Sequence, residues 1–193
     1  MLGKSLKIAI RFTLFTAVLL GIVYPLIVTG FAQVALTRQA NGELITRDGS
    51  IIGSRLIGQN FAADKYFHSR PSAAGNGYDA SNSSGSNYAQ SNQKLVTRIQ
   101  GDVAKASADN PSQPVPIDLV TASGSGLDPD ITPAAALYQV HRVAQARKLS
   151  DEQVTRLVKE HITPRQFGFL GEPRVNVLQL NLALDEQTKS SQD

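Results

Sequence analysis

The sequence has 193 residues, no cysteine, no tryptophan and a formal net charge of +3. Without cysteine, the chain can form neither disulfides nor thiolate metal sites. The positive charge is local, because three of the 19 Lys and Arg residues precede a long uncharged stretch and the other 16 balance the 16 Asp and Glu residues that follow it. We therefore exclude a basic stripe for nucleic acid, and about 155 residues remain for one ordinary domain.

The uncharged stretch predicts a transmembrane helix that begins at Phe12 and ends at Leu36. Its 25 residues would form a helix of about 37 Å, enough to cross a hydrocarbon core of roughly 30 Å. Pro25 predicts a kink near the middle, because proline cannot donate the helical hydrogen bond. A cleaved secretory signal is the alternative, but its apolar region is usually about 7 to 15 residues long, so we favour an anchor.

Basic residues orient this anchor. Lys4, Lys7 and Arg11 precede it and no acidic residue does, so the positive-inside rule places the N-terminus in the cytoplasm. The expected organisation is a cytoplasmic tail over residues 1–11, a single-pass helix over 12–36 and one periplasmic or extracellular domain over 37–193.

Two short apolar runs begin the outer domain. Leu44-Ile45 and Ile51-Ile52 flank Asp48-Gly49, and this pattern predicts a β-hairpin. Residues 54–61 extend the pattern into a candidate third strand.

A fixed turn and a polar loop come next. Pro71 forces Arg70 into an extended conformation, so residues 66–72 are expected to form a fixed turn rather than a helix. Residues 72–93 are Ser, Asn or Gly at 13 of 22 positions. This segment is either a flexible surface loop or an ordered, oxygen-rich loop docked on a partner.

Three helices follow, each with a recognisable start or stop. The first begins after the cap Asn92 and ends before Pro111. Thr132 followed by Pro133 begins the second, and a capping box at Ser150 begins the third. The positions expected to be buried on these helices are Leu95, Val96, Ile99, Val103, Leu137, Val140, Val143, Ala144, Val154, Leu157 and Val158.

Two further segments are expected to contain strands. Residues 115–120, VPIDLV, resemble a short strand. Residues 175–185, VNVLQLNLALD, fit a strand to about Val177 and a helix after it. Together these elements predict a single N-terminal transmembrane helix plus one α/β domain of the α+β type.

The outer domain shows no sequence pattern that predicts catalysis. Both common glycine-rich phosphate-binding fingerprints are missing, and residues 123–126 (SGSG) lack the lysine of a phosphate loop. The three histidines have no carboxylate at zinc-site spacing, and His141 is expected to pack on the inner or flanking face of its helix. Asp128 and Asp130 are better explained by the helix N-terminus that follows them than by a cation. We predict no catalytic residue and no metal ligand.

Several stretches, in order over nearly the whole chain, carry a resemblance to one family. The span with Tyr24-Pro25 is one, and LVTASGSGLDP, residues 119–129, is the most specific. The others are LIGQNF (56–61), YFHSRPSA (66–73), SGSNYAQSN (84–92), VPIDLVTASGSGLDPDIT (115–132), RVAQAR (142–147) and VNVLQLNLALD (175–185). With these motifs the chain resembles the C subunit of the bacterial Kdp potassium-transporting P-type ATPase. Tyr88, where relatives often carry leucine, is a mild departure.

The resemblance implies a subunit of a complex in the cell inner membrane. The implied partners are a channel-like subunit that selects potassium, a P-type subunit that hydrolyses ATP through an aspartyl-phosphate, and a very small single-span subunit. The family's C subunit is usually described as a catalytic chaperone that raises the ATP affinity of the ATPase subunit. From outside the membrane, it would do so only by conformational coupling. We expect no tightly bound cofactor: ATP belongs to the ATPase subunit and potassium is transported.

Two other roles stay open. One is a cap or filter over the potassium entrance of the channel-like subunit; the other is a free-standing anchored hydrolase, against which the missing catalytic residues argue. Contacts with partners or with the ion entrance are expected in polar, motif-rich loops, whose oxygens suit an alkali cation. The candidates are Asn60, Phe61, Tyr66, His68, Arg70, Ser84, Asn87, Asn92, Ser123, Ser125 and Asp128.

Overall fold

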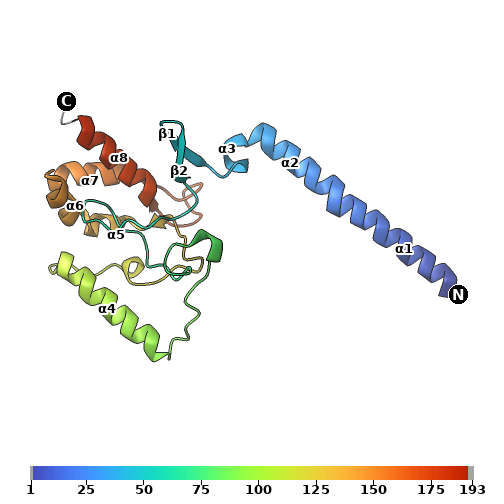
Figure 1. Ribbon diagram of the computed structural model, residues 1–193, viewed down its shortest axis with the longest axis horizontal. Helices are drawn as coiled ribbons and strands as arrows, with labels where there is room; N and C mark the ends of the chain where they lie inside the picture. The colour runs from blue at the N-terminus through green and yellow to red at the C-terminus, as the bar shows by residue number, and fades with distance from the viewer. Residues whose placement is uncertain (1, 191–193) are drawn as a thin grey trace. The chain divides into compact units, whose positions relative to one another are not determined.

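The computed structural model describes residues 2–190, which divide into two units (Figure 1). The first unit ends at Leu44, and the second begins at Ile45 and contains the hydrophobic core. The first is dominated by one long apolar helix, and the second combines helices with two small sheets. This architecture confirms the predicted fold class.

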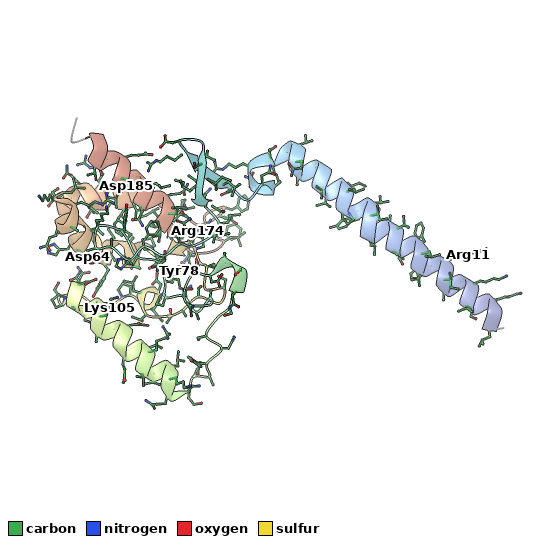
Figure 2. All side chains as sticks on the ribbon, in the orientation of Figure 1. Arg11, Asp64, Tyr78, Lys105, Arg174 and Asp185 are labelled. Carbon is green, nitrogen blue, oxygen red and sulfur yellow. The ribbon has the colours of Figure 1, made fainter. Side chains whose placement is uncertain are left out.

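The long helix has a wide turn in its middle. α1 (Leu2–Val18), the π-helical turn η1 (Leu19–Val23) and α2 (Tyr24–Ala35) follow one another directly, and the short α3 (Thr37–Ala40) comes after them. Side chains project from all sides of the long helix (Figure 2), and none of its described residues is buried. Pro25 lies in the first turn of α2, so the predicted irregularity takes the form of a π turn just before the proline. The helix is long and apolar enough to cross a membrane.

The predicted hairpin is confirmed. β1 (Leu44–Arg47) and β2 (Ser50–Ser54) form a two-stranded sheet, and Asp48 and Gly49 between them both have positive φ, as a tight hairpin turn requires.

The predicted third strand over residues 54–61 is wrong. After Ser54 the chain instead docks on a later loop, where the N–H of Gly58 donates to Leu127 O at 2.8 Å. A Cβ at Gly58 would lie 2.5 Å from Asp128 O, so this glycine permits a backbone approach that a side chain would block.

A three-stranded antiparallel sheet contributes side chains to the core. Its order is β3 (Asp130–Ile131), β5 (Arg174–Asn176), β4 (Ile162–Thr163), so β5 is central. Val175 of β5 faces Ile131 on one side and Ile162 on the other, and it is fully buried. α8 (Val177–Ser190) follows β5 directly, which confirms the predicted change from strand to helix.

The remaining helices begin where their caps predict. α4 (Gln93–Asp109) follows Asn92, whose side chain accepts the N–H of Lys94, and α5 (Pro133–Tyr138) follows Thr132, whose hydroxyl accepts the N–H of Ala135. α7 (Asp151–Glu160) begins with the complete Ser150 capping box. The other helical segments are η2 (Ala80–Asn82), η3 (Ile117–Leu119) and α6 (Val140–Arg147).

Three expectations about this region are wrong. Residues 115–120 contain the 3-10 turn η3 rather than a strand, because Pro114 and Pro116 remove backbone donors and the Asp118 carboxylate accepts the N–H of Thr132 at 2.7 Å. Leu137 is 40% exposed, and Val96 and Val103 of α4 are also exposed. His141 points outward, where its Nδ1 lies 3.1 Å from Asp151 Oδ2, because the inner face of α6 is filled by Val140, Val143 and Ala144.

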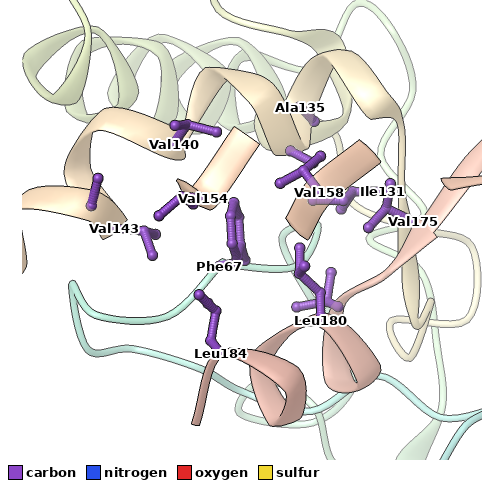
Figure 3. Close-up of a cluster of buried hydrophobic side chains, with 13 residues drawn as sticks. Phe67, Ile131, Ala135, Val140, Val143, Val154, Val158, Val175, Leu180 and Leu184 are labelled. Atoms are coloured by element: carbon purple, nitrogen blue, oxygen red, sulfur yellow. The ribbon is translucent and has the colours of Figure 1, made fainter. Parts of the chain in front are cut away.

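The core of the second unit is built around Phe67 (Figure 3). This ring is fully buried and lies among Val143, Val154, Leu180 and Leu184, all of which are also fully buried. The core therefore joins one irregular segment to helices from the second half of the chain.

Candidate functional site

The segment on either side of Phe67 is extended and is held by two buried amides. The side chain of Asn181 accepts the N–H of Phe67 at 2.8 Å and donates to its carbonyl at 3.0 Å. Gln139 does the same for His68, at 2.8 and 3.1 Å. The two amides therefore satisfy backbone groups that a neighbouring strand would otherwise satisfy.

Beyond Arg70, the Ser/Asn-rich segment packs against a second loop of the same chain. We call residues 70–85 and 121–128 together the loop cluster. Ser72 joins its two halves, because its hydroxyl donates to Gly126 O at 2.6 Å and accepts the N–H groups of Ala74 and Tyr78 at 3.2 and 2.7 Å.

Other hydroxyl groups repeat this pattern. Ser83 Oγ donates to Ser125 O at 2.9 Å, and Ser84 Oγ donates to Ala73 O at 3.2 Å. Gly126 has a φ of +70°, and a Cβ there would lie 2.7 Å from Ala74 Cβ. Of the two alternatives for residues 72–93, these contacts favour an ordered loop, and the surface it docks on belongs to its own chain.

An ion pair closes the cluster. Arg70 Nη1 lies 2.9 Å from Asp128 Oδ2, both side chains are half-buried, and Arg70 Nη2 also donates to Thr121 Oγ1 at 3.4 Å. The Tyr78 hydroxyl donates to the carbonyl of Arg70. Burial raises the pKa of Tyr78, and the negative charge of Asp128 adds to this effect. The cluster therefore fixes Arg70 through both its backbone and its side chain.

A groove of about 310 Å³ opens beside this ion pair. Four carboxylates and two guanidinium groups line it: Asp118, Asp128, Asp130, Glu172, Arg70 and Arg174. Burial raises the pKa of Asp130, although Asn176 and the Arg174 guanidinium, 3.0 Å away, act against this shift. Within residues 2–190, no three His, Asp or Glu side chains form a group that could hold a metal ion.

His68 lines a second, smaller cavity of about 180 Å³, together with Lys105 of α4. Its Nε2 lies 3.4 Å from Ala63 O. Burial lowers the pKa of His68, and the positive charge of Arg142 lowers it further. At neutral pH this imidazole is therefore expected to be uncharged.

Two predicted aromatic residues lie in packing positions outside the loop cluster. The rings of Phe61 and Tyr66 are 5.4 Å apart, and Phe61 packs against the core. The Tyr66 hydroxyl donates to Asp185 at 3.2 Å, and the Arg147 guanidinium lies 4.9 Å from its ring. Burial raises the pKa of Tyr66, and Asp185 raises it further.

The structure brings together five of the predicted candidates and separates the rest. Arg70, Ser84, Ser123, Ser125 and Asp128 lie in the loop cluster. Ser125 Oγ accepts the N–H of Leu127 at 3.1 Å, and Ser123 is buried with no hydrogen-bond partner for its hydroxyl among the described residues. The candidates outside the cluster are the aromatic pair, His68, the helix cap Asn92, and Asn60 and Asn87, which are both exposed.

The sequence reasoning missed the residues that hold the cluster and the extended segment in place. Ser72 and Gly126 join the loops, and the run Ser123-Gly124-Ser125-Gly126 was the available signal for the second. Asn181 interrupts the apolar face of α8, and Gln139 lies between α5 and α6. A polar side chain in such a position predicts a buried hydrogen bond, but not its partner.

The sequence is similar to proteins of one known family. Residues 6–186 match the family described as KdpC, the c chain of K+-transporting ATPase. The chain is 56% identical over 182 residues to the potassium-transporting ATPase KdpC subunit of Koribacter versatilis, covering 94% of each chain. It is 57% identical over 183 residues to that of Acidobacterium capsulatum, covering 95% of this chain and 98% of the relative. The KdpC subunit of Caulobacter vibrioides is 57% identical over 173 residues, which are 89% of this chain. The chain therefore belongs to the KdpC family of potassium-transporting ATPase subunits.

Proposed function

We propose that this chain is a non-catalytic accessory subunit of a high-affinity, ATP-driven potassium uptake complex. The proposal rests on the division of the molecule into two units. An apolar helix of membrane length has no buried residue within the chain, and the separate second unit uses the hydroxyls of its most polar region for its own carbonyls. Such a helix is suited to contacts with lipid and with helices of other subunits, and such a unit is suited to binding a partner rather than to catalysis.

The proposed partners are the channel-like potassium-selective subunit, the P-type ATPase subunit and a small single-span subunit. Three basic side chains, Lys4, Lys7 and Arg11, lie in α1 ahead of the uncharged part of the helix, and they support a cytoplasmic N-terminus. Residues 1–11 would then be the tail, residues 12–36 the span and residues 37–193 the domain on the outer side.

For the role of that domain we favour conformational coupling. Contact with the transport machinery outside would raise the ATP affinity of the ATPase subunit inside, since affinity at one site can change through a distant contact. A cap over the potassium entrance is the second candidate. The rigid loop cluster favours it, because this cluster offers fixed polar loops rather than a flexible segment.

A protease test checks the orientation on which both roles depend. In intact spheroplasts, added protease is expected to digest the second unit and leave the N-terminus protected. Protection of the second unit together with cleavage near Lys4 would overturn both roles.

Steady-state ATPase activity of the intact complex separates the two roles. Asn87→Ala changes an exposed loop residue, and Ser125→Ala changes a hydroxyl of the loop cluster. A cap predicts that these variants alter the apparent potassium affinity more than the apparent ATP affinity. Coupling predicts the reverse order. Saturable ATP binding by this chain in the absence of the ATPase subunit would contradict both and favour direct contact with ATP.

A further inference from the structure

The π turn η1 leaves backbone carbonyls in the middle of the long helix without their usual donors. In a regular α-helix the carbonyl of Leu20 would accept the N–H of Tyr24, but this N–H donates to Leu19 O instead. The next donor along the chain would be residue 25, which is Pro25 and has no N–H. The carbonyl of Leu20 is therefore left without a donor from its own helix, and the carbonyl of Gly21 loses the donor that it would have in an α-helix.

Hydroxyls of the first unit bond to backbone carbonyls elsewhere, but not at this gap. Thr16 Oγ1 donates to Phe12 O at 2.8 Å, and Thr37 Oγ1 donates to Gln33 O at 2.6 Å, in each case four positions back. At that spacing, the two open carbonyls are followed by a tyrosine and a proline, and neither has a hydroxyl close to its backbone. No side chain in the described part of the chain bonds to either carbonyl. The missing donor must therefore come from another molecule.

The depth of the gap excludes water as a ready substitute. Positions 20 and 21 lie near the centre of the uncharged stretch over residues 12–36, which is the proposed span. In hydrocarbon an unpaired backbone group is costly, and a proline in a membrane helix is tolerated where a neighbouring helix supplies the partner. No atom lies within 4 Å of a Cβ built at Gly21, so a neighbouring helix can approach the bare backbone closely.

The surroundings of the gap indicate a neutral donor. A lysine or arginine at this depth would require an acidic partner, and residues 12–36 contain no charged side chain. Amide and hydroxyl side chains donate without carrying a charge, and their oxygens also accept. Tyr24, directly before Pro25, is 61% exposed, and its hydroxyl bonds to no described residue. A group that both donates and accepts therefore suits this part of the helix.

We propose that a membrane helix of a partner subunit places a neutral amide or hydroxyl side chain against the carbonyls of Leu20 and Gly21. This inference rests on the proposed function, because it takes the chain as one subunit of a membrane complex. The partner group donates to the carbonyls that η1 and Pro25 leave open, and the bare backbone at Gly21 lets its helix come close. The long helix is then a specific docking element as well as an anchor.

Retention in the purified complex tests the docking position. We compare wild type with Gly21→Leu, which covers the open carbonyls, and with Gly30→Leu, the matched change within α2; no atom lies within 4 Å of a Cβ at either glycine. With the tag on the ATPase subunit, Gly21→Leu should be retained about tenfold less than wild type, and Gly30→Leu should be retained normally. Equal retention of all three chains, or equal losses in both variants, would overturn the inference and leave the proposed function standing. Failure of the wild type to copurify would overturn both.

Thermal unfolding of the full chain in detergent separates docking from folding. Gly21 lies in the first unit, whereas the hydrophobic core lies in the second. The unfolding midpoint of Gly21→Leu should therefore equal that of wild type while its retention falls. A loss of retention that is accompanied by a lower midpoint would contradict a docking role.

Crosslinking identifies the partner group. Leu20 is 62% exposed, so a benzophenone amino acid at this position should join the chain to a partner subunit when the intact complex is irradiated. The crosslinked segment should be a membrane helix that carries Asn, Gln, Ser or Thr near the site of attachment. A crosslink to lipid or detergent alone, or to a segment without such a side chain, would overturn the proposal.

Replacement of the proline tests the hydrogen bond itself. Pro25→Ala restores an N–H that can donate to the open carbonyls, so the partner group is no longer required. Changing the crosslinked Asn, Gln, Ser or Thr of the partner to alanine should lower the retention of wild type about tenfold and leave that of Pro25→Ala unchanged. Equal losses in the two chains would show that the partner side chain does not bond to these carbonyls.

Discussion

Residues 66–70 and residues 72–85 are neighbouring stretches that are neither helix nor strand over most of their length. Different side chains hold each of them in place. The first contains Phe67, which is fully buried, and its backbone is bound by amides from the core. The second is only partly buried, and serine hydroxyls bind it to another loop. In both stretches, hydrogen bonds from side chains take the place of the backbone hydrogen bonds that a β-sheet would supply. The difference in burial determines what the loss of each contact should cost.

The largest effect is expected at the buried ring. Phe67→Ala would leave a cavity among four fully buried side chains, and we expect a loss of about 3–5 kcal/mol in the free energy of unfolding. Phe169→Ala, at an exposed position, is the control and should stay within about 0.5 kcal/mol of wild type. Denaturant unfolding of the full chain in detergent, followed by circular dichroism, measures both. Similar losses in the two variants would contradict burial of the Phe67 ring as the source of the effect.

The buried amide comes next. Asn181→Leu keeps approximately the volume but leaves the N–H and carbonyl of Phe67 buried without these partners, so we expect a loss of about 2–4 kcal/mol. Gln139→Leu should cost less, because His68, whose backbone it binds, is only half-buried. The same unfolding measurement ranks the two variants. A larger loss for Gln139→Leu would contradict burial as the deciding factor.

Two glycines of the loop that residues 72–85 contact give a matched pair of variants. Gly126→Ala would bring a Cβ within 2.7 Å of Ala74 at a positive φ, so we expect a loss of about 1–3 kcal/mol. No atom lies within 4 Å of a Cβ at Gly124, so Gly124→Ala should be nearly neutral. Proteolysis of residues 72–85 under native conditions should accelerate only in Gly126→Ala. Equal resistance of the two variants would show that the loop cluster does not depend on this contact.

The smallest effect concerns pH. The pKa of His68 is lowered in the folded chain from an ordinary value of 6.5, so the unfolded chain binds the proton more readily. Stability should therefore fall as the pH drops through 6.5 towards the lowered pKa, and it should be unaffected by this group above that range. The raised pKa of Asp130 acts in the opposite direction, and only in the acidic range above 3.8. His68→Gln should flatten the slope near neutrality. Unfolding midpoints across this pH range would contradict the assignment if His68→Gln kept the slope.

Much of the fold could be predicted because its signals are local. The uncharged run before Leu36, the caps Asn92, Thr132 and Ser150, and the Asp48-Gly49 turn each act within a few residues of the chain. The change from strand to helix at Val177 could also be predicted, because the spacing of apolar residues changes there.

The rest depends on contacts between distant residues. Residues 54–61 have a suitable strand composition, but Gly58 docks on Leu127, and nothing near Gly58 in the sequence indicates this partner. The candidate site was predicted as a set of polar loops without their pairing. Its central contact, from Ser72 to Gly126, spans 54 positions. Sequence patterns identify polar residues that require hydrogen-bond partners, but the fold determines which partners they contact.

The amide bonds of Asn181 also have a consequence for biosynthesis. Phe67 and Asn181 are 114 positions apart, and Asn181, Leu180 and Leu184 are all carried by the 14-residue helix α8. During synthesis, Phe67 emerges long before these residues exist. The second unit therefore cannot complete its core until α8 has been synthesised, and contacts of such long range form slowly. A premature stop codon before α8 would consequently leave the core side chains of the second unit exposed to solvent, and would not merely remove a peripheral segment.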